Sequence, residues 1–401
     1  MPKKHLTIVL FILMIFLMIW GPNVSEASTS KYVRFHQERT TNLKLIPENI
    51  SFQRFVFDSG LHFEYPDAVR GIYVTGHSAG GSRFEQLIDL IENSDLNAMV
   101  IDIKDDWGNI TFQVDEDSPY AEFAKNYISD PEQMMKVLEE KQIYPIARIV
   151  AFKDTVLAER RPDLSFTQNG EVWKNNRNEA FVNPFLKEVW DHNINIAKMA
   201  VELGFQDIQF DYVRFPEGFE LRDEELVYDQ GEYANSELNN IQRRVEAVTD
   251  FVKYARETLG QYGVDVSVDI FGYAATIPET PGIGQNFTKI AENVDVISSM
   301  IYPSHWTAHY FGIPFPDKEP YRLVTEYAKV ENELLSKLDD PPISRPWIQD
   351  FEAPWLYNGP VMQYGKEEVE AQIKALNEQG IFEFLLWNAG NEYTRGVNYI
   401  P

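Results

Sequence analysis

Two carboxylates at the ends of strand-like segments could form a catalytic pair. Residues 208–213 and 264–270 are short apolar segments that contain Asp211 and Asp269. Neighbouring strands of a sheet lie about 4.8 Å apart, a separation at which two carboxyl groups can act on one glycosidic bond. One group would protonate the leaving oxygen, and the other would stabilise or attack the oxocarbenium-like centre. We therefore predict Asp211 and Asp269 as catalytic residues; the alternative for each is a helix N-cap or an ion-pair partner.

Eight segments of this kind organise the chain, and stretches with helical periodicity separate them. They are residues 71–75, 98–103, 144–150, 208–213, 264–270, 294–302, 346–350 and 382–387. Parallel strands need crossover connections, and eight strand–helix units close into a barrel. The sequence therefore predicts an α/β fold, a (β/α)8 TIM barrel, over residues 69–401.

Capping residues mark the ends of the predicted helices. Asp130 and Asn183 are each followed by proline, which pairs an N-cap acceptor with the residue best tolerated at the first helical position. Gly204 and Gly380 follow the last apolar residues of two helices, where a left-handed residue is favoured. A further helix is expected over 241–255 because its apolar residues recur every three or four positions.

Three of the loops that follow the predicted strands are unusually long. They cover residues 153–182, 214–238 and 303–319, after strands three, four and six. The loops at the carboxyl ends of the strands build the active site of TIM-barrel enzymes. We therefore expect the site on the side of the barrel that carries these loops.

Polar and aromatic residues at the predicted strand ends and in these loops are candidates for substrate binding, because aromatic faces suit the apolar faces of sugar rings. The predicted substrate-binding residues are Asp102, Lys104, Arg148, Trp173, Tyr212, Arg214, Tyr302, His305, Trp306, Glu352, Trp387 and Asn388. Asp102 and Lys104 share one strand face and are expected to form a buried pair. Asp105 and Asp106 are expected to be solvated turn residues.

Composition excludes several other functions. The chain has 36 basic and 62 acidic side chains, a net charge of -26, which would repel nucleic acid and anionic membranes. Cysteine is absent, which removes thiolate metal sites and cysteine nucleophiles. No G-x-G-x-x-G follows a predicted strand, so no cofactor is expected. A metal site at Asp102, Asp105 and Asp106 would need further oxygen ligands, and we predict no metal.

The N-terminus has the pattern of a secretory signal peptide. Lys3 and Lys4 precede an apolar run over residues 6–20, and small residues follow. We predict a signal peptide over 1–27, with an uncleaved anchor as the alternative, and an N-terminal strap over 28–68. Either arrangement places the protein outside the cell, secreted or at the cell surface, with membrane contact only through an uncleaved N-terminal segment.

Five sequence blocks resemble a family of exported bacterial proteins with a glycoside-hydrolase-like TIM barrel, long catalogued as a domain of unknown function. They lie at residues 71–75, 100–105, 210–216, 267–272 and 300–306, and the Phe-Asp-Tyr-Val-Arg-Phe-Pro block at 210–216 is the most specific. The resemblance covers about residues 69–395 and implies a barrel that acts on a polysaccharide. More distant relatives of the α-amylase type imply an acid at Asp211, but this chain has Gln209 and Asp269 where they have arginine and glutamate.

The leading hypothesis is an exported glycoside hydrolase that cleaves a cell-surface or extracellular polysaccharide or oligosaccharide. A barrel that binds glycan without cleaving it is the alternative, because a fold alone does not establish activity. A lyase or transglycosylase would use the same residues. The acidity of the chain favours neutral or cationic glycans over anionic ones.

Overall fold

The computed structural model describes residues 57–356 and 362–401. The predicted signal peptide and the first part of the predicted strap lie outside the described residues, so both stay predictions. Within these two ranges, no helix combines the length and the apolar character that crossing a membrane requires.

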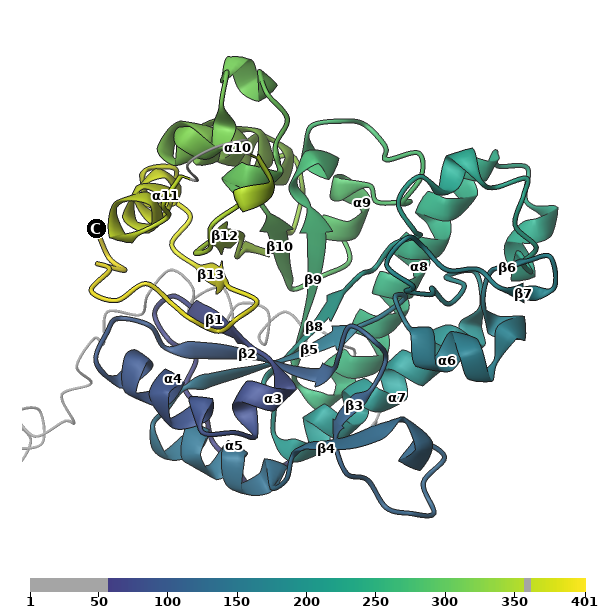
Figure 1. Ribbon diagram of the computed structural model, residues 1–401, viewed down its shortest axis with the longest axis horizontal. Helices are drawn as coiled ribbons and strands as arrows, with labels where there is room; N and C mark the ends of the chain where they lie inside the picture. Colours follow the sequence, from purple (N-terminus) through teal and green to yellow (C-terminus); the bar gives the residue numbers. More distant parts are fainter. Residues whose placement is uncertain (1–56, 357–361) are drawn as a thin grey trace, which may run out of the picture. The chain divides into compact units, whose positions relative to one another are not determined.

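Eight parallel strands close into a ring (Figure 1). They are β1 (Arg70–Val74), β2 (Ala98–Lys104), β5 (Tyr144–Val150), β8 (Asp207–Asp211), β9 (Asp265–Phe271), β10 (Val296–Met300), β12 (Trp347–Gln349) and β13 (Phe384–Trp387). Each strand pairs with the next in this order, and β1 pairs with both β2 and β13. The predicted (β/α)8 TIM barrel is confirmed, and every barrel strand overlaps one of the eight predicted segments.

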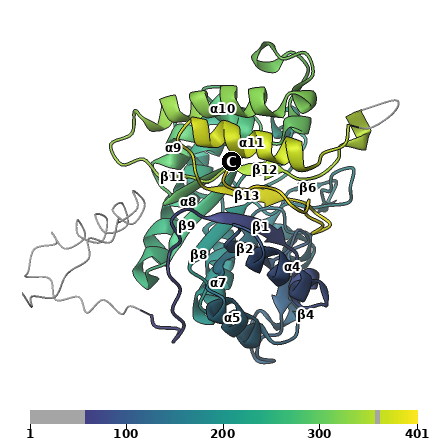
Figure 2. The same cartoon turned by 90° about the vertical axis from the view of Figure 1, so that its left-hand side faces the viewer.

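Helices connect successive barrel strands and surround the ring (Figures 1 and 2). They are α4 (Arg83–Glu92), α5 (Pro131–Glu140), α7 (Lys187–Leu203), α8 (Asn240–Leu259), α9 (Phe287–Ala291), α10 (Pro320–Leu335) and α11 (Lys366–Glu378). Two short helices, α3 (Gly76–Ala79) and α6 (Thr155–Arg160), lie in the loops after β1 and β5. The remaining strands are β3 (Ile110–Phe112), β4 (Ala124–Ile128), β6 (Thr167–Gln168), β7 (Glu171–Val172) and β11 (Ile343–Ser344).

The helix ends show where local sequence signals hold. Asp130 caps α5, because its side chain accepts a hydrogen bond from the backbone N–H of Gln133. Gly204 follows α7 with a φ of 103°, as expected for a left-handed C-terminal residue. The predicted start of α7 was wrong: Asn183 lies in a preceding turn, and the helix begins at Lys187. The Asn183 side chain instead contacts the Phe185 N–H and the Asp229 carbonyl.

The interior of the barrel is apolar on one side and polar on the other. A cluster of inward-facing apolar side chains, separate from the core under the helices, comprises Val69, Tyr73, Ala98, Val100, Tyr144, Ile146, Tyr302, Trp347 and Leu385. On β8 and β9 the alternate positions are polar instead. Gln209 donates to Ser298 Oγ at 3.1 Å, and Ser267 donates to Asp207 Oδ1 at 2.6 Å. Because strand side chains alternate, the same faces carry Asp211 and Asp269.

The amino ends of the strands enclose a buried charge cluster. Arg345 contacts Asp207 at 2.7 Å and Glu383 at 2.8 Å, and all three side chains are inaccessible to solvent. Tyr65, which precedes β1, donates to Glu383 and accepts a hydrogen bond from Arg345. The described end of the predicted strap is therefore tied to the bottom of the barrel, opposite the long loops.

Candidate active site

A pocket of about 660 Å3 opens at the carboxyl ends of the barrel strands. The predicted residues that line it are Arg148, Asp211, Tyr212, Arg214, Asp269, Tyr302, His305, Trp306 and Trp387. They come from β5, β8, β9 and β13 and from the loops that follow β8 and β10. The structure thus brings together both predicted catalytic aspartates and most of the predicted substrate-binding residues.

Asp211 ends β8 and is held by three donors. Arg148 donates to its Oδ2 from Nε at 3.0 Å and from Nη2 at 2.6 Å. The backbone N–H of Tyr212 donates to Oδ1 at 2.6 Å. Tyr212 has a φ of 52°, an unfavourable value for a residue with a side chain. Strain of this kind concentrates at functional sites, and here it accompanies a fixed carboxylate.

Arg148 also contacts two other aspartates. Its Nη1 lies 2.7 Å from Asp102 Oδ1, and its Nη2 lies 3.1 Å from Asp106 Oδ1. Tyr73 donates to the second oxygen of Asp102 at 2.6 Å. Burial raises the pKa of Asp102 to about 6, although the Arg148 charge opposes the shift. Asp102 therefore lies behind Arg148 as its partner and does not line the pocket.

Asp106 lies in a turn as predicted, and its side chain is 42% exposed, but it is also ion-paired at the pocket. Its carboxylate contacts Arg148 and also Lys153, the latter at 3.3 Å. Burial raises its pKa, but the charges of Arg148 and Lys153 outweigh burial and leave the pKa below its usual value. Asp106 is a pocket residue because the turn after β2 folds over the end of the neighbouring strand β5.

Asp269 is 1% exposed and lines the same pocket. Burial raises its pKa well above the usual range, and the neighbouring charge of Asp211 adds to the shift. Trp347 donates its indole N–H to Oδ1 at 2.7 Å, while Oδ2 has no hydrogen-bond partner among the described residues. β8 and β9 pair Phe210 with Val268, so Asp211 and Asp269 are the next residues in that register. The two carboxyl groups thus have opposite environments, one paired with arginine and one buried beside tryptophan.

Aromatic rings form the wall of the pocket on the β13 side. Trp387 stacks on Tyr73 with ring centres 4.1 Å apart and contacts the edge of Trp347 at 5.4 Å. Tyr302 lies 6.4 Å from Trp387 and 5.2 Å from the His305 ring. Burial lowers the pKa of His305. This wall offers flat apolar faces beside the two carboxyl groups.

Each of the three long loops reaches the pocket, as predicted from their lengths. The loop after β5 contributes Arg177, and the loop after β10 contributes His305 and Trp306. The loop after β8 contributes Arg214 and Glu217, which form an ion pair of 3.2 Å. The guanidinium of Arg214 also lies 4.7 Å from the Tyr212 ring centre.

Lys104 is a correction to the predicted site. It does not pair with Asp102; its Nζ contacts Asp154 at 2.6 Å and Asn193 of α7 at 2.9 Å. The pairing of β2 with β5 shifts register between Asp102 and Lys104, which breaks the alternation assumed for this strand. Lys104 is inaccessible to solvent and faces the surrounding helices, not the pocket.

Three other predicted residues also do not line the pocket. The side chain of Trp173 lies beside Arg222, whose guanidinium is 5.5 Å from its ring. Asn388 donates to the carbonyls of Asp350 and Glu392 and so holds the loop after β13. Glu352 is exposed in the loop after β12.

Sequence reasoning missed several residues that do line the pocket. They are Asp106, Arg177, Glu217, Phe271, Gly272, Met300, Thr307 and Trp347. Tyr273 and Tyr310, which the sequence places among the aromatic residues at the strand ends and in the long loops, also line the pocket. Trp347 lies near the start of the short strand β12, and its role depends on the contact with Asp269 across the barrel.

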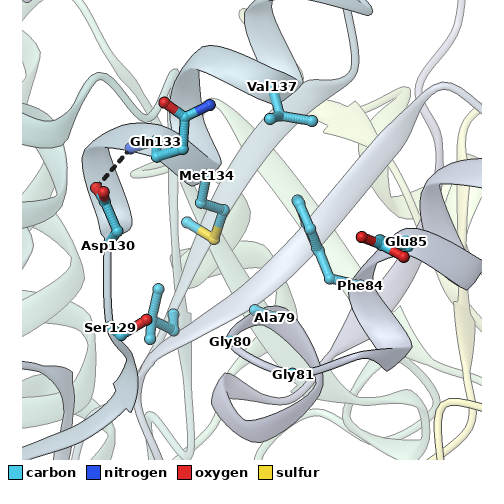
Figure 3. A pocket seen from close by; sticks show the side chains of 11 residues that line it. Ala79, Gly80, Gly81, Phe84, Glu85, Ser129, Asp130, Gln133, Met134 and Val137 are labelled. Carbon is cyan, nitrogen blue, oxygen red and sulfur yellow. Dashed lines mark hydrogen bonds between the residues drawn. The ribbon is translucent and has the colours of Figure 1, made fainter.

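Two other kinds of site offer fewer reactive side chains than the barrel mouth. In the described ranges, no group of three or more His, Asp or Glu side chains is placed to hold a metal ion. A smaller pocket of about 230 Å3 lies where α3 and α4 meet the start of α5, and Figure 3 shows Phe84, Met134 and Val137 around it. Its Asp130 serves as the cap of α5, with Oδ1 2.9 Å from the Gln133 nitrogen. We therefore place the candidate active site in the barrel mouth.

A closed parallel barrel with two carboxyl groups in its mouth is the arrangement that is typical of glycoside-hydrolase barrels. The chain belongs to the family described as "Putative glycosyl hydrolase domain", whose model matches residues 71–393. This match confirms the family resemblance and supports the assignment of the chain as a glycoside hydrolase. No curated protein matches the sequence.

Solved structures also resemble the chain. A protein of Ruminiclostridium thermocellum described as hypothetical is 33% identical, covering 49% of this chain and 96% of that one, with a TM-score of 0.42. The PgaB (BpsB) glycoside hydrolase domain of Bordetella bronchiseptica is 15% identical, covering 81% of this chain and 95% of that one, with a TM-score of 0.56. The latter likeness supports the fold.

Proposed function

We propose that the protein is an exported glycoside hydrolase that cleaves a cell-surface or extracellular polysaccharide with Asp211 and Asp269. The observation that carries this proposal is the contrast between two neighbouring carboxyl groups in one pocket. Asp269 has a raised pKa through burial, and Asp211 is ion-paired with Arg148. Glycosidases need this contrast, because one group must give a proton while the other supplies negative charge.

Asp269 is assigned the role of general acid. Its raised pKa keeps a proton available, and its Oδ2 is free of other partners in the described part of the chain. The indole N–H of Trp347 holds Oδ1 and thereby fixes the orientation of the carboxyl group. Proton transfer from Oδ2 to the glycosidic oxygen would leave Asp269 as a carboxylate that the same indole stabilises.

Asp211 is assigned the role of the second carboxylate. The two N–H groups of Arg148 fix its position and fill the lone-pair sites of Oδ2, whereas Oδ1 accepts one bond from the Tyr212 N–H and retains a lone pair. Its negative charge would face the anomeric carbon as positive charge develops there. The aromatic wall formed by Tyr302 and Trp387 would hold the sugar ring against the two acids.

Export and a polymeric substrate rest on other grounds. The basic, then apolar, then small-residue order of residues 1–27 supports secretion. Outside the cell, the common glycans are the polysaccharides of surfaces and matrices. The net charge of -26 favours neutral or cationic members of this class.

The test is a reducing-end release assay on laminarin, chitosan and polygalacturonate, which represent neutral, cationic and anionic glycans. Asp211→Asn and Asp269→Asn should each lose activity by several orders of magnitude while remaining folded and retaining glycan binding. Asp163→Asn, at an exposed ion pair away from the pocket, is the matched control and should keep full activity. Equal binding but no cleavage by all four proteins would favour the glycan-binding alternative.

A further inference from the structure

A large exposed aromatic side chain lies just outside the pocket. Trp355, in the short helical turn Pro354–Leu356 after β12, is 62% exposed. Phe351 stacks against it with ring centres 6.4 Å apart and an interplanar angle of 25°. An isolated exposed aromatic residue needs no explanation, but this one continues a chain of rings.

The chain of rings leads into the pocket. The ring of His305, a pocket residue, lies 6.0 Å from Trp355 and 6.0 Å from Phe351. Phe351 contacts Tyr302 at 5.6 Å, and Tyr302 contacts Trp387. Both Tyr302 and Trp387 line the pocket beside the catalytic aspartates. The apolar wall of the pocket therefore continues outward along β12 and its loop to Trp355.

We propose that Trp355, supported by Phe351, is a binding platform for a further sugar ring of the same glycan chain that occupies the pocket. The pocket site then extends at this end, so the enzyme binds a glycan chain that is longer than the pocket. This inference rests on the proposed function, because it extends the substrate from the pocket. The occupant is a pyranose ring, whose apolar face matches an aromatic face.

The neighbouring charge defines the glycan further. The exposed carboxylate of Glu352 lies between Phe351 and Trp355 in sequence and has no ion-pair or hydrogen-bond partner among the described residues. A free carboxylate beside the platform accepts hydrogen bonds from sugar hydroxyl or ammonium groups and repels uronates. The platform therefore suits a neutral or amino-sugar chain.

The experiment compares Trp355→Ala, Trp355→Phe and a control, Phe382→Ala, in the Asp269→Asn background, which separates binding from cleavage. Phe382 is 44% exposed and precedes β13, at the opposite end of the barrel from the pocket. Affinity is measured by gel retardation and fluorescence titration with laminarin and chitosan and with a size series of their oligosaccharides. In the cleaving enzyme, KM and kcat are measured on the same series.

Trp355→Ala should weaken binding of the long chains by about 2- to 10-fold, the value of one aromatic contact, and raise KM with kcat nearly unchanged. The shortest oligosaccharides, which fill the pocket alone, should bind with unchanged affinity. Trp355→Phe should retain most of the wild-type affinity for long chains. Phe382→Ala should bind them with wild-type affinity.

Equal affinity of Trp355→Ala and wild type at every chain length would overturn the platform. A loss that is the same for short and long glycans would also overturn it, because that result places Trp355 in the pocket itself. If long-chain binding depends on Trp355 but no glycan is cleaved by the wild type, the platform stands and the hydrolase assignment fails. If no glycan binds at all, both proposals are overturned.

Discussion

Arg148 donates two hydrogen bonds to a single oxygen of Asp211, from Nε at 3.0 Å and from Nη2 at 2.6 Å. A third nitrogen, Nη1, contacts Asp102 at 2.7 Å on the other side. The guanidinium is 1% exposed, so its orientation is fixed by these carboxylates. Arg148 therefore positions the proposed catalytic carboxylate from a neighbouring strand, two positions before the end of β5.

Replacing Arg148 by lysine should lower kcat on the order of 100-fold, because a single ammonium group cannot make the paired contacts of the guanidinium. KM should change much less. Steady-state kinetics on the best substrate would measure both values. Arg70→Lys is the control, because Arg70 begins β1 at the end of the barrel away from the pocket. This variant should have wild-type kcat and KM. A fully active Arg148→Lys enzyme would show that Asp211 needs no such support.

Trp347→Phe should move the alkaline limb of the pH–activity profile to higher pH. The indole N–H stabilises the ionised form of Asp269, so its removal raises the pKa of that acid further. The proton needed by the leaving group is then retained to higher pH. Trp190→Phe removes a buried indole that donates to the Pro184 carbonyl outside the barrel, and it should leave the profile in place. A downward shift in Trp347→Phe would contradict the assignment of Asp269 as the acid.

Cleavage should proceed with retention of anomeric configuration. Asp211 and Asp269 follow a directly paired position on adjacent strands, and adjacent strands are about 4.8 Å apart. Retaining enzymes place their carboxyl groups about 5–5.5 Å apart, whereas inverting enzymes need room for a water molecule. Proton NMR of the first product formed, before mutarotation, distinguishes the two outcomes. An inverted product would require a different second carboxylate, such as Glu217 in the adjacent loop.

Asp207→Asn should flatten the dependence of stability on pH between about pH 4 and 6. Burial raises the pKa of Asp207 to about 6 in the folded state from an ordinary value of 3.8. The folded state therefore binds a proton that the unfolded state releases. The stability that this group contributes is fully present below pH 4 and is lost as the pH rises through 6.

The size of this effect for one buried group is up to about 3 kcal/mol. Asp102, with a pKa of about 6, contributes in the same direction, so the Asp207→Asn variant should lose only part of the slope. Urea unfolding at a series of pH values measures how the free energy of unfolding depends on pH. An unchanged slope in Asp207→Asn, with Asp163→Asn as the exposed control, would refute the prediction.

The sequence was sufficient to predict the barrel because each strand carries its own signal. Buried parallel strands such as Tyr144–Val150 are continuous apolar runs bounded by turns, and helices such as α5 begin at recognisable caps. The side of the barrel that holds the pocket followed from loop lengths alone. Asp211 and Asp269 could be assigned to the barrel interior from strand alternation.

The contacts between elements could not be predicted in the same way. The register shift after Asp102 turns Lys104 toward α7, and nothing local in the sequence indicates this shift. Arg148 binds aspartates from two other segments, and Trp347 reaches Asp269 from β12. These contacts join residues of different strands, which come together only in the closed barrel. The sequence pattern of a single strand therefore does not predict them.

The pairing of the first barrel strand with the last has a consequence for how the protein is made. Arg70 pairs with Phe384 and Ile72 with Leu386, so the ring stays open until the final strand has been synthesised. Before that point, β1 and β12 are exposed sheet edges, which invite pairing with other chains. A chain that lacks β13 therefore cannot close the ring and retains two free sheet edges. We conclude that truncation before residue 384 would leave this barrel without its closure and its pocket without Trp387.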